Sequence, residues 1–242
     1  MLMLMLKKTQ RNCFIRLMLG TYETELMPLT NKNISIANNP LADKMAVEFL
    51  KRGSVIALPT DTVYGLACDA TNSNAIDRLF TIKDRPQNKP LAICLHNIND
   101  IKKYASVKFL PTGLLRELLP GPVTLLLQRR NSDLSPLLTS SGKIGIRVPD
   151  YPFIRRVVEK LGKPLALSSA NLSKEPESVK ISQFQSIWSD IDGIFDGGYL
   201  GTNCEPSTIV DLSKHGFYFV VREGRAHKET GNSLRRHGLQ AR

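Results

Sequence analysis

The sequence predicts an α/β fold built on a single mixed β-sheet. Segments with helical spacing of apolar residues alternate with short strand-like runs, an alternation typical of helices packed on a sheet. The last two strand-like runs, Ser207 to Leu212 and Phe217 to Val221, are joined by a short loop around His215-Gly216, which favours an antiparallel hairpin. No Pro-rich or Ser-rich linker divides the body of the chain, so we expect one domain.

The individual elements follow from local signals. We expect the folded part to begin near Asn33, and Asn39-Pro40 to open a helix that ends at Gly53. One face of that helix should carry Leu41, Met45, Phe49 and Leu50. The remaining predicted elements are a strand over 54–58, a helix carrying Ile76, Leu79 and Phe80, a strand from Leu91 to Leu95, a helical stretch over 111–118, strands over 123–128 and 144–148, a helix over 152–161, a strand over 164–168 and a helix over about 181–188.

The composition is that of a folded protein in water. Hydrophobic residues make up 42% and charged residues 23% of the 242 positions. No apolar run approaches the roughly 20 residues that a membrane-spanning helix needs, so we do not expect an integral membrane protein. The four cysteines, Cys13, Cys68, Cys94 and Cys204, form no C-x-x-C pair, and we expect them to be reduced and the protein to be cytoplasmic.

The net charge of +11 is concentrated at the chain ends. Residues 1–33 carry five Lys or Arg against two Glu, and residues 222–242 carry six against two. We interpret residues 1–32 as a basic N-terminal extension, 33–226 as the folded domain and 227–242 as a basic tail, with RNA binding by these ends as the alternative. Because no acidic residue occurs before Gly20, the extension could also be a mitochondrial presequence.

Three cations, Lys83, Arg85 and Lys89, fall within one short polar stretch. Pro86 disfavours helical geometry for Arg85, so the preceding helix should end here and leave the cations in a helix-to-strand loop. Arg can grip two phosphate oxygens and Lys adds a mobile charge, so this loop would suit a triphosphate and a departing pyrophosphate. The alternative is a solvated basic helix C-terminus favoured by the helix dipole.

A second polar cluster, Ser168-Ser169-Ala170-Asn171, follows the strand-like run Pro164 to Leu167. Ligands of α/β sheets tend to bind beyond the carboxyl ends of strands, where hydroxyl and amide groups can bond phosphate or carboxylate oxygens. The cluster could equally be the N-cap of the segment that follows, since Ser and Asn are strong capping residues.

Two further segments place polar groups in apolar surroundings. Thr60, Thr62 and Tyr64 occupy alternate positions, which would put three hydroxyls on one face of an extended strand; a simple strand edge is the alternative. Arg147 lies in an apolar strand, where its charge needs a partner. That partner could be a bound carboxylate or an acidic residue such as Asp150 or Asp69.

Common catalytic and metal motifs are absent from the sequence. It contains no G-x-x-x-x-G-K-[ST], G-x-G-x-x-G, H-E-x-x-H or G-x-S-x-G. His96, His215, His227 and His237 are scattered without ligand spacing, so we predict no resident metal site.

Six motifs occur in order between Met45 and Gly224: Pro-Thr-x-Thr-Val-Tyr-Gly-Leu, Lys-x-Arg-Pro, Pro-Gly-Pro-x-Thr, Arg-x-Pro, Ser-x-Asn-Leu-Ser and Ser-Thr-Ile-Val-Asp. In these motifs the chain resembles the YrdC family of threonylcarbamoyl-AMP synthases. The resemblance implies a twisted mixed sheet with helices packed around it and a basic concave cleft. It also implies that residues 33–226 form the catalytic domain of a single-domain member.

The resemblance assigns roles to individual residues. It implies catalytic roles for Lys83, Arg85, Ser169 and Asn171. Positions that hold threonine in the family correspond to Thr62, Cys94, Arg147, Leu167 and Ser207, and positions that hold ATP correspond to Lys83, Arg85, Lys89, Lys143, Ser169 and Arg222. The chain departs from the common family pattern at Lys89, Cys94 and Glu177, where relatives often carry Asn, His and Ser.

The activity that the resemblance implies joins L-threonine, bicarbonate or CO2 and ATP into threonylcarbamoyl-AMP and releases pyrophosphate, with Mg²⁺ assisting. The product would pass to a tRNA threonylcarbamoyl transferase complex that modifies adenosine beside the anticodon. One alternative is a non-catalytic RNA-binding module that uses the same basic cleft, and weak RNA binding could also accompany the enzyme. Another is an enzyme that forms a carbamoyl-adenylate from a different amine or from carbamoyl phosphate.

Overall fold

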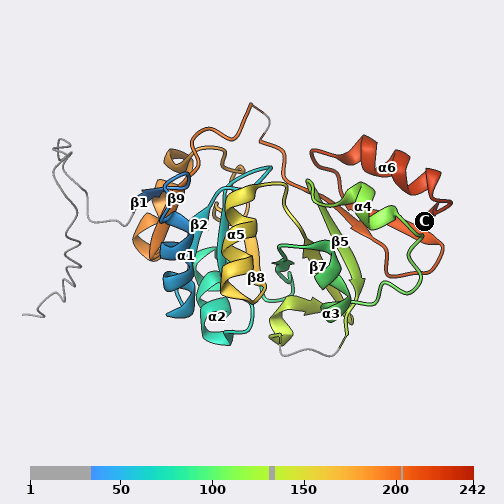
Figure 1. Cartoon of the computed structure of the whole chain (residues 1–242), viewed down its shortest axis with the longest axis horizontal. Coiled ribbons are helices and arrows are strands. Elements are labelled where there is room, and N and C mark those ends of the chain that lie inside the picture. The colour runs from blue at the N-terminus through green and yellow to red at the C-terminus, as the bar shows by residue number, and fades with distance from the viewer. Residues whose placement is uncertain (1–33, 131–133, 203) are drawn as a thin grey trace, which may run out of the picture. The chain divides into compact units, whose positions relative to one another are not determined.

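The computed structural model describes residues 34–130, 134–202 and 204–242, and Figure 1 shows how they are arranged. These residues belong to one compact unit. The predicted N-terminal extension, residues 1–32, and the presequence hypothesis lie outside the described residues. Within the described ranges, no helix is long and apolar enough to cross a membrane.

Helices precede or follow most strands, as the alternating sequence pattern predicts. The α-helices of the described residues are α1 (Ala42–Lys51), α2 (Ser73–Ile82), α3 (Ile101–Tyr104), α4 (Leu114–Leu118), α5 (Pro152–Leu161) and α6 (His227–Arg236), and the 3-10 helices are η1 (Ile98–Asp100), η2 (Pro136–Leu138) and η3 (Ile181–Asp190).

The strands of the described residues form a mixed sheet, which confirms the predicted fold class. They are β1 (Ile34–Ile36), β2 (Ile56–Leu58), β3 (Gly65–Asp69), β4 (Ala92–Cys94), β5 (Val123–Gln128), β6 (Thr139–Ser140), β7 (Lys143–Arg147), β8 (Leu165–Ser169), β9 (Gly193–Asp196), β10 (Thr208–Asp211), β11 (Phe217–Arg222) and β12 (Gln240–Ala241). Their order is β1-β9-β2-β3-β8-β4-β7-β5-β10-β11-β12, with β6 paired to β7.

Parallel and antiparallel pairs coexist in this sheet. Strands β4 and β7 run parallel, as do β5 and β10, whereas β8 runs antiparallel to both β3 and β4. Strands β10 and β11 form the antiparallel hairpin that the sequence predicts.

The two faces of the sheet pack against different helices. Alternate side chains along a strand point to opposite faces. On one face, Ala67, Cys94 and Leu165 pack in a cluster with residues of α1 and α5, and Figure 1 shows these two helices beside each other. On the other face, Leu66, Ile93 and Ile146 belong to the larger core together with residues of α2, α4 and η3. Strands such as β3, β4 and β8 therefore contribute side chains to a hydrophobic cluster on each face of the sheet.

Helix α1 shows where sequence periodicity was misleading. We expected Leu41 and Met45 on its buried face, but they are 45% and 41% exposed. The buried face is instead formed by Ala42, Asp43, Ala46, Val47 and Leu50. Small residues on that face let α1 pack closely against α5, and Asp43 is accommodated because it pairs with Lys160 of that helix. In contrast, α5 spans the predicted residues, Pro152–Leu161.

Residues 227–242 differ from the expected solvated tail. They form α6 and strand β12, and Leu234 and Leu239 are buried. Helix α6 packs near α4, where Glu117 forms an ion pair with Arg236 and lies 2.8 Å from the ring nitrogen Nε2 of His237. The segment was predicted as a tail because most of its residues are polar or charged, and only a few apolar residues such as Leu234 and Leu239 anchor it.

Candidate functional site

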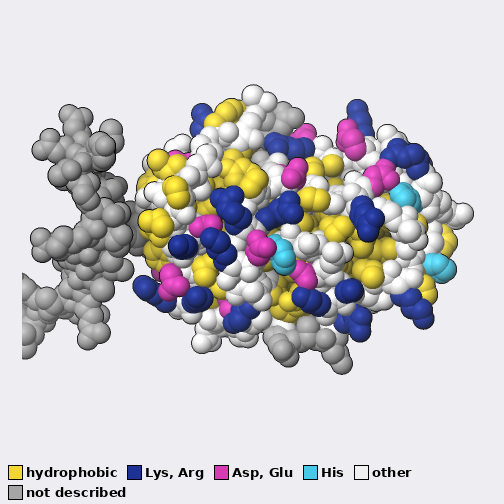
Figure 2. Space-filling view, viewed as in Figure 1, with side chains coloured by type: hydrophobic (Ala, Val, Ile, Leu, Met, Phe, Trp, Pro, Cys, Tyr) yellow, Lys and Arg dark blue, Asp and Glu magenta, His cyan; other side chains and the backbone are white. Residues whose placement is uncertain are grey.

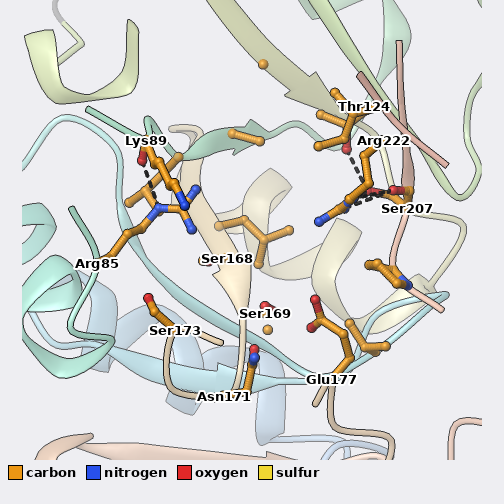
Figure 3. Close-up of a pocket in the computed structure, with 18 of the residues that line it drawn as sticks. Arg85, Lys89, Thr124, Ser168, Ser169, Asn171, Ser173, Glu177, Ser207 and Arg222 are labelled. Carbon is orange, nitrogen blue, oxygen red and sulfur yellow. Dashed lines mark hydrogen bonds between the residues drawn. The ribbon is translucent and has the colours of Figure 1, made fainter. Parts of the chain in front are cut away.

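A cleft of about 670 Å³ opens on the sheet face that α1 and α5 cover only in part. Its floor consists of residues of β3, β4, β5, β7, β8 and β10. The loop at 84–90 forms one wall, Ser207 and Arg222 form the opposite wall, and the loop at 171–177 lies between them. Figure 3 shows the side chains of these distant segments around one central space.

Small residues make the floor of the cleft deep. Gly65, Ala92 and Gly145 line it, on strands β3, β4 and β7. A Cβ added at Gly145 would lie 3.3 Å from the Cβ of Ala92, and one added at Gly65 would lie 2.7 Å from a methyl carbon of Leu167. A side chain at either glycine would therefore require its neighbour in the floor to shift.

One wall carries the cations Arg85 and Lys89. Arg85 donates from Nε to the carbonyl oxygen of Lys89 at 2.8 Å and from Nη2 to that of Pro90 at 3.1 Å. These bonds hold the guanidinium against its own loop, and Figure 3 shows Arg85 and Lys89 together beside the central space. Burial lowers the pKa of Arg85, and the negative charge of Glu177 opposes that shift.

Lys83 has a different position from the one we expected. Its side chain is only 2% exposed and is not among the residues that line the cleft. Its Nζ donates to the carbonyl oxygens of Ser169 and Asn171, both at 2.5 Å. Burial is the main cause that lowers the pKa of Lys83 to about 8. The alternative interpretation of Lys83 as part of a solvated helix C-terminus is therefore wrong. Lys83 instead holds the loop after β8 in place.

The loop after β8 contributes Ser169, Asn171 and Ser173 to the cleft. Asn171 donates from Nδ2 to the carbonyl oxygens of Leu172 and Glu175, at 3.0 and 2.7 Å. It does not cap a helix, because the next helix of the described residues, η3, begins only at Ile181. The N-cap interpretation of this cluster is therefore wrong.

Arg147 reaches the cleft from the end of β7. Its Nη2 donates to Asp61 at 2.5 Å and to the hydroxyl of Thr62 at 2.7 Å. The structural partner is thus Asp61, not Asp150 or Asp69. The Nε of Arg147 is buried without a hydrogen-bond partner, so the guanidinium retains a donor that its acidic neighbour does not use.

The hydroxyls of Thr60 and Tyr64 serve separate purposes. Thr60 and Thr62 lie 3.2 Å apart, oxygen to oxygen. The Tyr64 hydroxyl lies 2.9 Å from a carboxylate oxygen of Asp196 and accepts from the amide of Gly197. Strand β3 begins only at Gly65, so the predicted strand with three hydroxyls on one face is wrong.

The opposite wall is built from Ser207 and Arg222. Arg222 donates from Nε and Nη2 to the carbonyl oxygen of Ser207, at 3.1 and 2.8 Å, and from Nη2 to its hydroxyl at 3.2 Å. The Ser207 hydroxyl lies 2.8 Å from that of Thr124. Figure 3 shows this group facing the cleft across from Arg85. Burial lowers the pKa of Arg222, and the charges of Arg147 and Arg85 lower it further, while Glu177 opposes the shift.

The structure brings most of the predicted site residues together. Those that line the cleft are Arg85, Lys89, Arg147, Leu167, Ser169, Asn171, Ser207 and Arg222. Lys83 and Thr62 lie directly behind lining residues and bond to them.

Cys94 and Lys143 are predicted site residues that do not line the cleft. Cys94 is fully buried in the cluster that includes Phe153 and Ile154 of α5, and burial raises the pKa of its thiol to about 12. Helix α5 covers this end of β4, so the thiol does not reach the cleft. Lys143 starts β7, four residues from Arg147, and pairs with Asp211 at 2.8 Å instead of facing the cleft.

Sequence reasoning did not single out Thr124 and Ser173. Thr124 ends the motif Pro-Gly-Pro-x-Thr, and Ser173 ends the motif Ser-x-Asn-Leu-Ser, so both belonged to recognised patterns. Ser173 lines the cleft, and its amide donates to the carbonyl oxygen of Lys83 at 2.9 Å. Their positions in these motifs could have identified them as candidate site residues.

The described residues contain no group of three or more His, Cys, Asp or Glu side chains that could hold a metal ion. Three acidic residues nevertheless line the cleft singly: Asp84, Glu175 and Glu177. Most ion pairs of the described residues, such as those of Asp43 and Asp69, lie outside the cleft.

Comparisons with known proteins agree with this architecture. The Sua5/YciO/YrdC family model, described as telomere recombination, matches residues 48–224. The threonylcarbamoyl-AMP synthase of Bos taurus is 42% identical over 204 residues, which cover 81% of this chain and 72% of the relative. That of Homo sapiens is also 42% identical, over 77% of this chain and 68% of the relative.

A solved structure shows the same fold. The crystal structure of P. abyssi Sua5 complexed with L-threonine superposes with a TM-score of 0.76 at 25% identity and covers 87% of this chain. This chain spans 62% of the length of that Sua5 chain. Taken together, the match over residues 48–224 and the identity to the mammalian relatives show that the chain belongs to the Sua5/YciO/YrdC family.

Proposed function

We propose that this protein is a threonylcarbamoyl-AMP synthase, which makes threonylcarbamoyl-AMP and pyrophosphate from L-threonine, bicarbonate or CO2 and ATP. The observation that carries the proposal is the cleft itself. It places the cations Arg85, Lys89 and Arg222 and the hydroxyl groups of Ser169 and Ser207 around one small-residue floor. The identity to synthases of mammals and the threonine complex of P. abyssi Sua5 support the same function.

Threonine would bind at the end of the cleft formed by Arg147 and Ser207. Arg147 lines the cleft and can pair with the substrate carboxylate, while Asp61 keeps the guanidinium in place. Ser207 can bond to the amino acid because its hydroxyl already faces the cleft beside Thr124. Leu167 would contact the aliphatic part of the substrate from the floor.

The phosphate chain of ATP would lie between the two cationic walls. Arg85 and Lys89 approach it from one side and Arg222 from the other, and Ser169 and Asn171 offer polar groups between them. Arg85 and Arg222 are fixed by bonds to backbone carbonyl oxygens, so they need little rearrangement when charge develops on the departing pyrophosphate. Lys83 is a positioning residue, since its ammonium bonds to the carbonyl oxygens of Ser169 and Asn171.

The reaction needs no covalent enzyme intermediate. The free amine of threonine adds through nitrogen to the carbon of CO2 and loses a proton, which gives a carbamate. A carbamate oxygen then bonds to the α-phosphorus of ATP while the bond to the β-phosphate oxygen breaks, and pyrophosphate leaves with that electron pair. The protein contributes by holding the three reactants in the orientation that the reaction needs and by stabilising the negative charge on the departing pyrophosphate.

A phosphate-bound Mg²⁺ fits the donor groups of the cleft. Mg²⁺ takes oxygen ligands and is usually bound by one or two carboxylates together with substrate phosphates. The cleft supplies Asp84, Glu175 and Glu177, and one oxygen of Glu177 is buried without a hydrogen-bond partner. When bound with the nucleotide, the ion would neutralise charge on the phosphate oxygens.

The direct test is synthesis from purified components. The protein is incubated with ATP, labelled bicarbonate and L-threonine, and the adenylate is detected by mass spectrometry and pyrophosphate by a coupled assay. We expect the threonylcarbamoyl adenylate with threonine and a much lower yield with serine or alanine. Formation of an adenylate without threonine would instead indicate a different amine or carbamoyl donor. Tight, salt-sensitive RNA binding with no product would favour the non-catalytic alternative.

The later steps of the pathway form part of the same proposal. The product would be used by a tRNA threonylcarbamoyl transferase complex to modify adenosine beside the anticodon. Figure 2 shows Lys and Arg side chains dispersed over the visible face and interspersed with acidic ones. That distribution supports catalysis in the cleft more than RNA binding across this face.

A further inference from the structure

Glu177 is an unusual group for a cleft that would bind phosphates. It lies on the loop after β8 and lines the cleft, and Figure 3 shows its carboxylate directed into the central space. Its Oε2 is buried and has no hydrogen-bond partner. A buried carboxylate oxygen without a hydrogen-bond partner is costly, so this group is incompletely satisfied by the protein alone.

The surrounding charges show how close Glu177 is to the phosphate-binding cations. Burial lowers the pKa values of Lys83, Arg85 and Arg222, and the negative charge of Glu177 opposes the shift in all three. The carboxylate therefore lies within electrostatic reach of both cationic walls. A polyphosphate that bridges these walls would bring its own negative charge to the same place, and like charges repel strongly in a partly desolvated site.

A cation that bridges the phosphates and the carboxylate would remove this conflict. Such an ion would bind the carboxylate of Glu177 and would neutralise the added phosphate charge. We propose that Glu177 is the protein ligand of the divalent cation that enters the cleft with the phosphate chain of the nucleotide, an inference that rests on the proposed function.

The other two acidic residues of the cleft are less suited to this role. Asp84 is exposed, in a turn at the end of α2. Glu175 is also exposed, and its Oε2 accepts a hydrogen bond from the amide of Leu172 at 3.3 Å. Glu177 combines a cleft position with a buried, unbonded oxygen, a combination that neither of the others shows.

The test measures binding instead of turnover. Adenosine 5′-(α,β-methylene)triphosphate, which cannot release pyrophosphate, is titrated calorimetrically into the whole protein with Mg²⁺ or with EDTA and no threonine. For the unmodified protein we expect Mg²⁺ to tighten binding clearly. For Glu177→Gln we expect tighter binding than the unmodified protein in EDTA and weaker binding in Mg²⁺, so that the gain from Mg²⁺ falls by about tenfold.

Two further variants separate a metal ligand from a simple charge. Glu159→Gln removes one negative charge from the exposed side of α5, outside the cleft, and should leave the gain from Mg²⁺ unchanged. Glu177→Asp retains a carboxylate and should restore part of that gain. If Glu177→Gln changes binding equally with and without Mg²⁺, Glu177 only balances charge and the inference is wrong. If the unmodified protein fails to bind the analogue in both conditions, the proposed function fails as well.

Discussion

Replacement of Lys83 by Met tests how a buried ammonium supports the cleft. Burial lowers the pKa of Lys83 from its ordinary value of 10.5 to about 8, and the side chain is 2% exposed. Below pH 8 the residue is protonated in both the folded and the unfolded chain, and the folded state bears the full cost of the buried charge. Above pH 8 the folded protein loses this proton before the unfolded chain does, so the cost decreases as the pH rises toward 10.5.

The pKa difference gives the size of the effect. A shift of this size costs the folded state about 3 kcal/mol at pH 7 and about 1 kcal/mol at pH 9.5. The free energy of unfolding of the unmodified protein should therefore increase by about 2 kcal/mol relative to Lys83→Met between these pH values. Comparison with the variant cancels the titration of groups that both proteins share.

Urea unfolding at several pH values, followed by circular dichroism, provides the measurement. Lys44→Met is the matched control, because Lys44 is exposed on α1 and should show no such pH-dependent difference. At pH 7 Lys83→Met also leaves the carbonyl oxygens of Ser169 and Asn171 without their donor, so its synthase activity should fall steeply. A stability difference between Lys83→Met and the unmodified protein that stays constant from pH 7 to 9.5 would refute the reasoning.

Three further predictions concern other parts of the structure. Arg85→Ala should lower threonine-dependent pyrophosphate release at least a hundredfold while thermal stability changes little, because the guanidinium bonds only to its own loop; near-normal turnover in the coupled assay would contradict its role. Leu234→Ala should reduce the free energy of unfolding by about 2–4 kcal/mol, since Leu234 is fully buried in α6; an unchanged urea midpoint would show that α6 is dispensable. Cys94→Ala should leave the KM for threonine within about twofold, as the thiol lies in the core under α5. A large rise in that KM would place Cys94 in the binding site after all.

Local sequence signals predicted the elements whose boundaries are set by a strong residue preference. Pro152 starts α5 and Gly162, with a left-handed backbone, follows its last residue, and both boundaries were predicted. Helix α1 lacks comparable information about its buried face. Its exposed Leu41 and Met45 are larger and more apolar than the buried Ala42 and Ala46, so periodicity alone selected the wrong side.

The sequence predicted which residues belong to the candidate site, but not how deeply each side chain lies or which of them face the cleft. Motifs identified Arg85 in a helix-to-strand loop and Ser169 at a strand end, a place typical of ligand binding, and the family resemblance implied a role for Arg222. The depth at which each side chain lies depends on packing that no motif records. Cys94 occupies the same sheet face as Arg147 and directly neighbours it in the pairing of β4 with β7, yet Arg147 lines the cleft and Cys94 lies in the core with residues of α5.

The adjacent cations Lys83 and Arg85 show how one short motif can perform two physical tasks. Helix α2 ends at Ile82, and Asp84 adopts a left-handed backbone with φ of 47°, so the chain turns between the two cations. Lys83 then points inward to the loop at 169–173, whereas Arg85 lines the cleft. The amide of Ser173 bonds to the carbonyl oxygen of Lys83, which ties the same two loops together a second time. The phosphate-facing Arg85 and the hydroxyl-bearing loop after β8 are thus held in a fixed relation by one turn, and a change at Lys83 must disturb both of these loops at once.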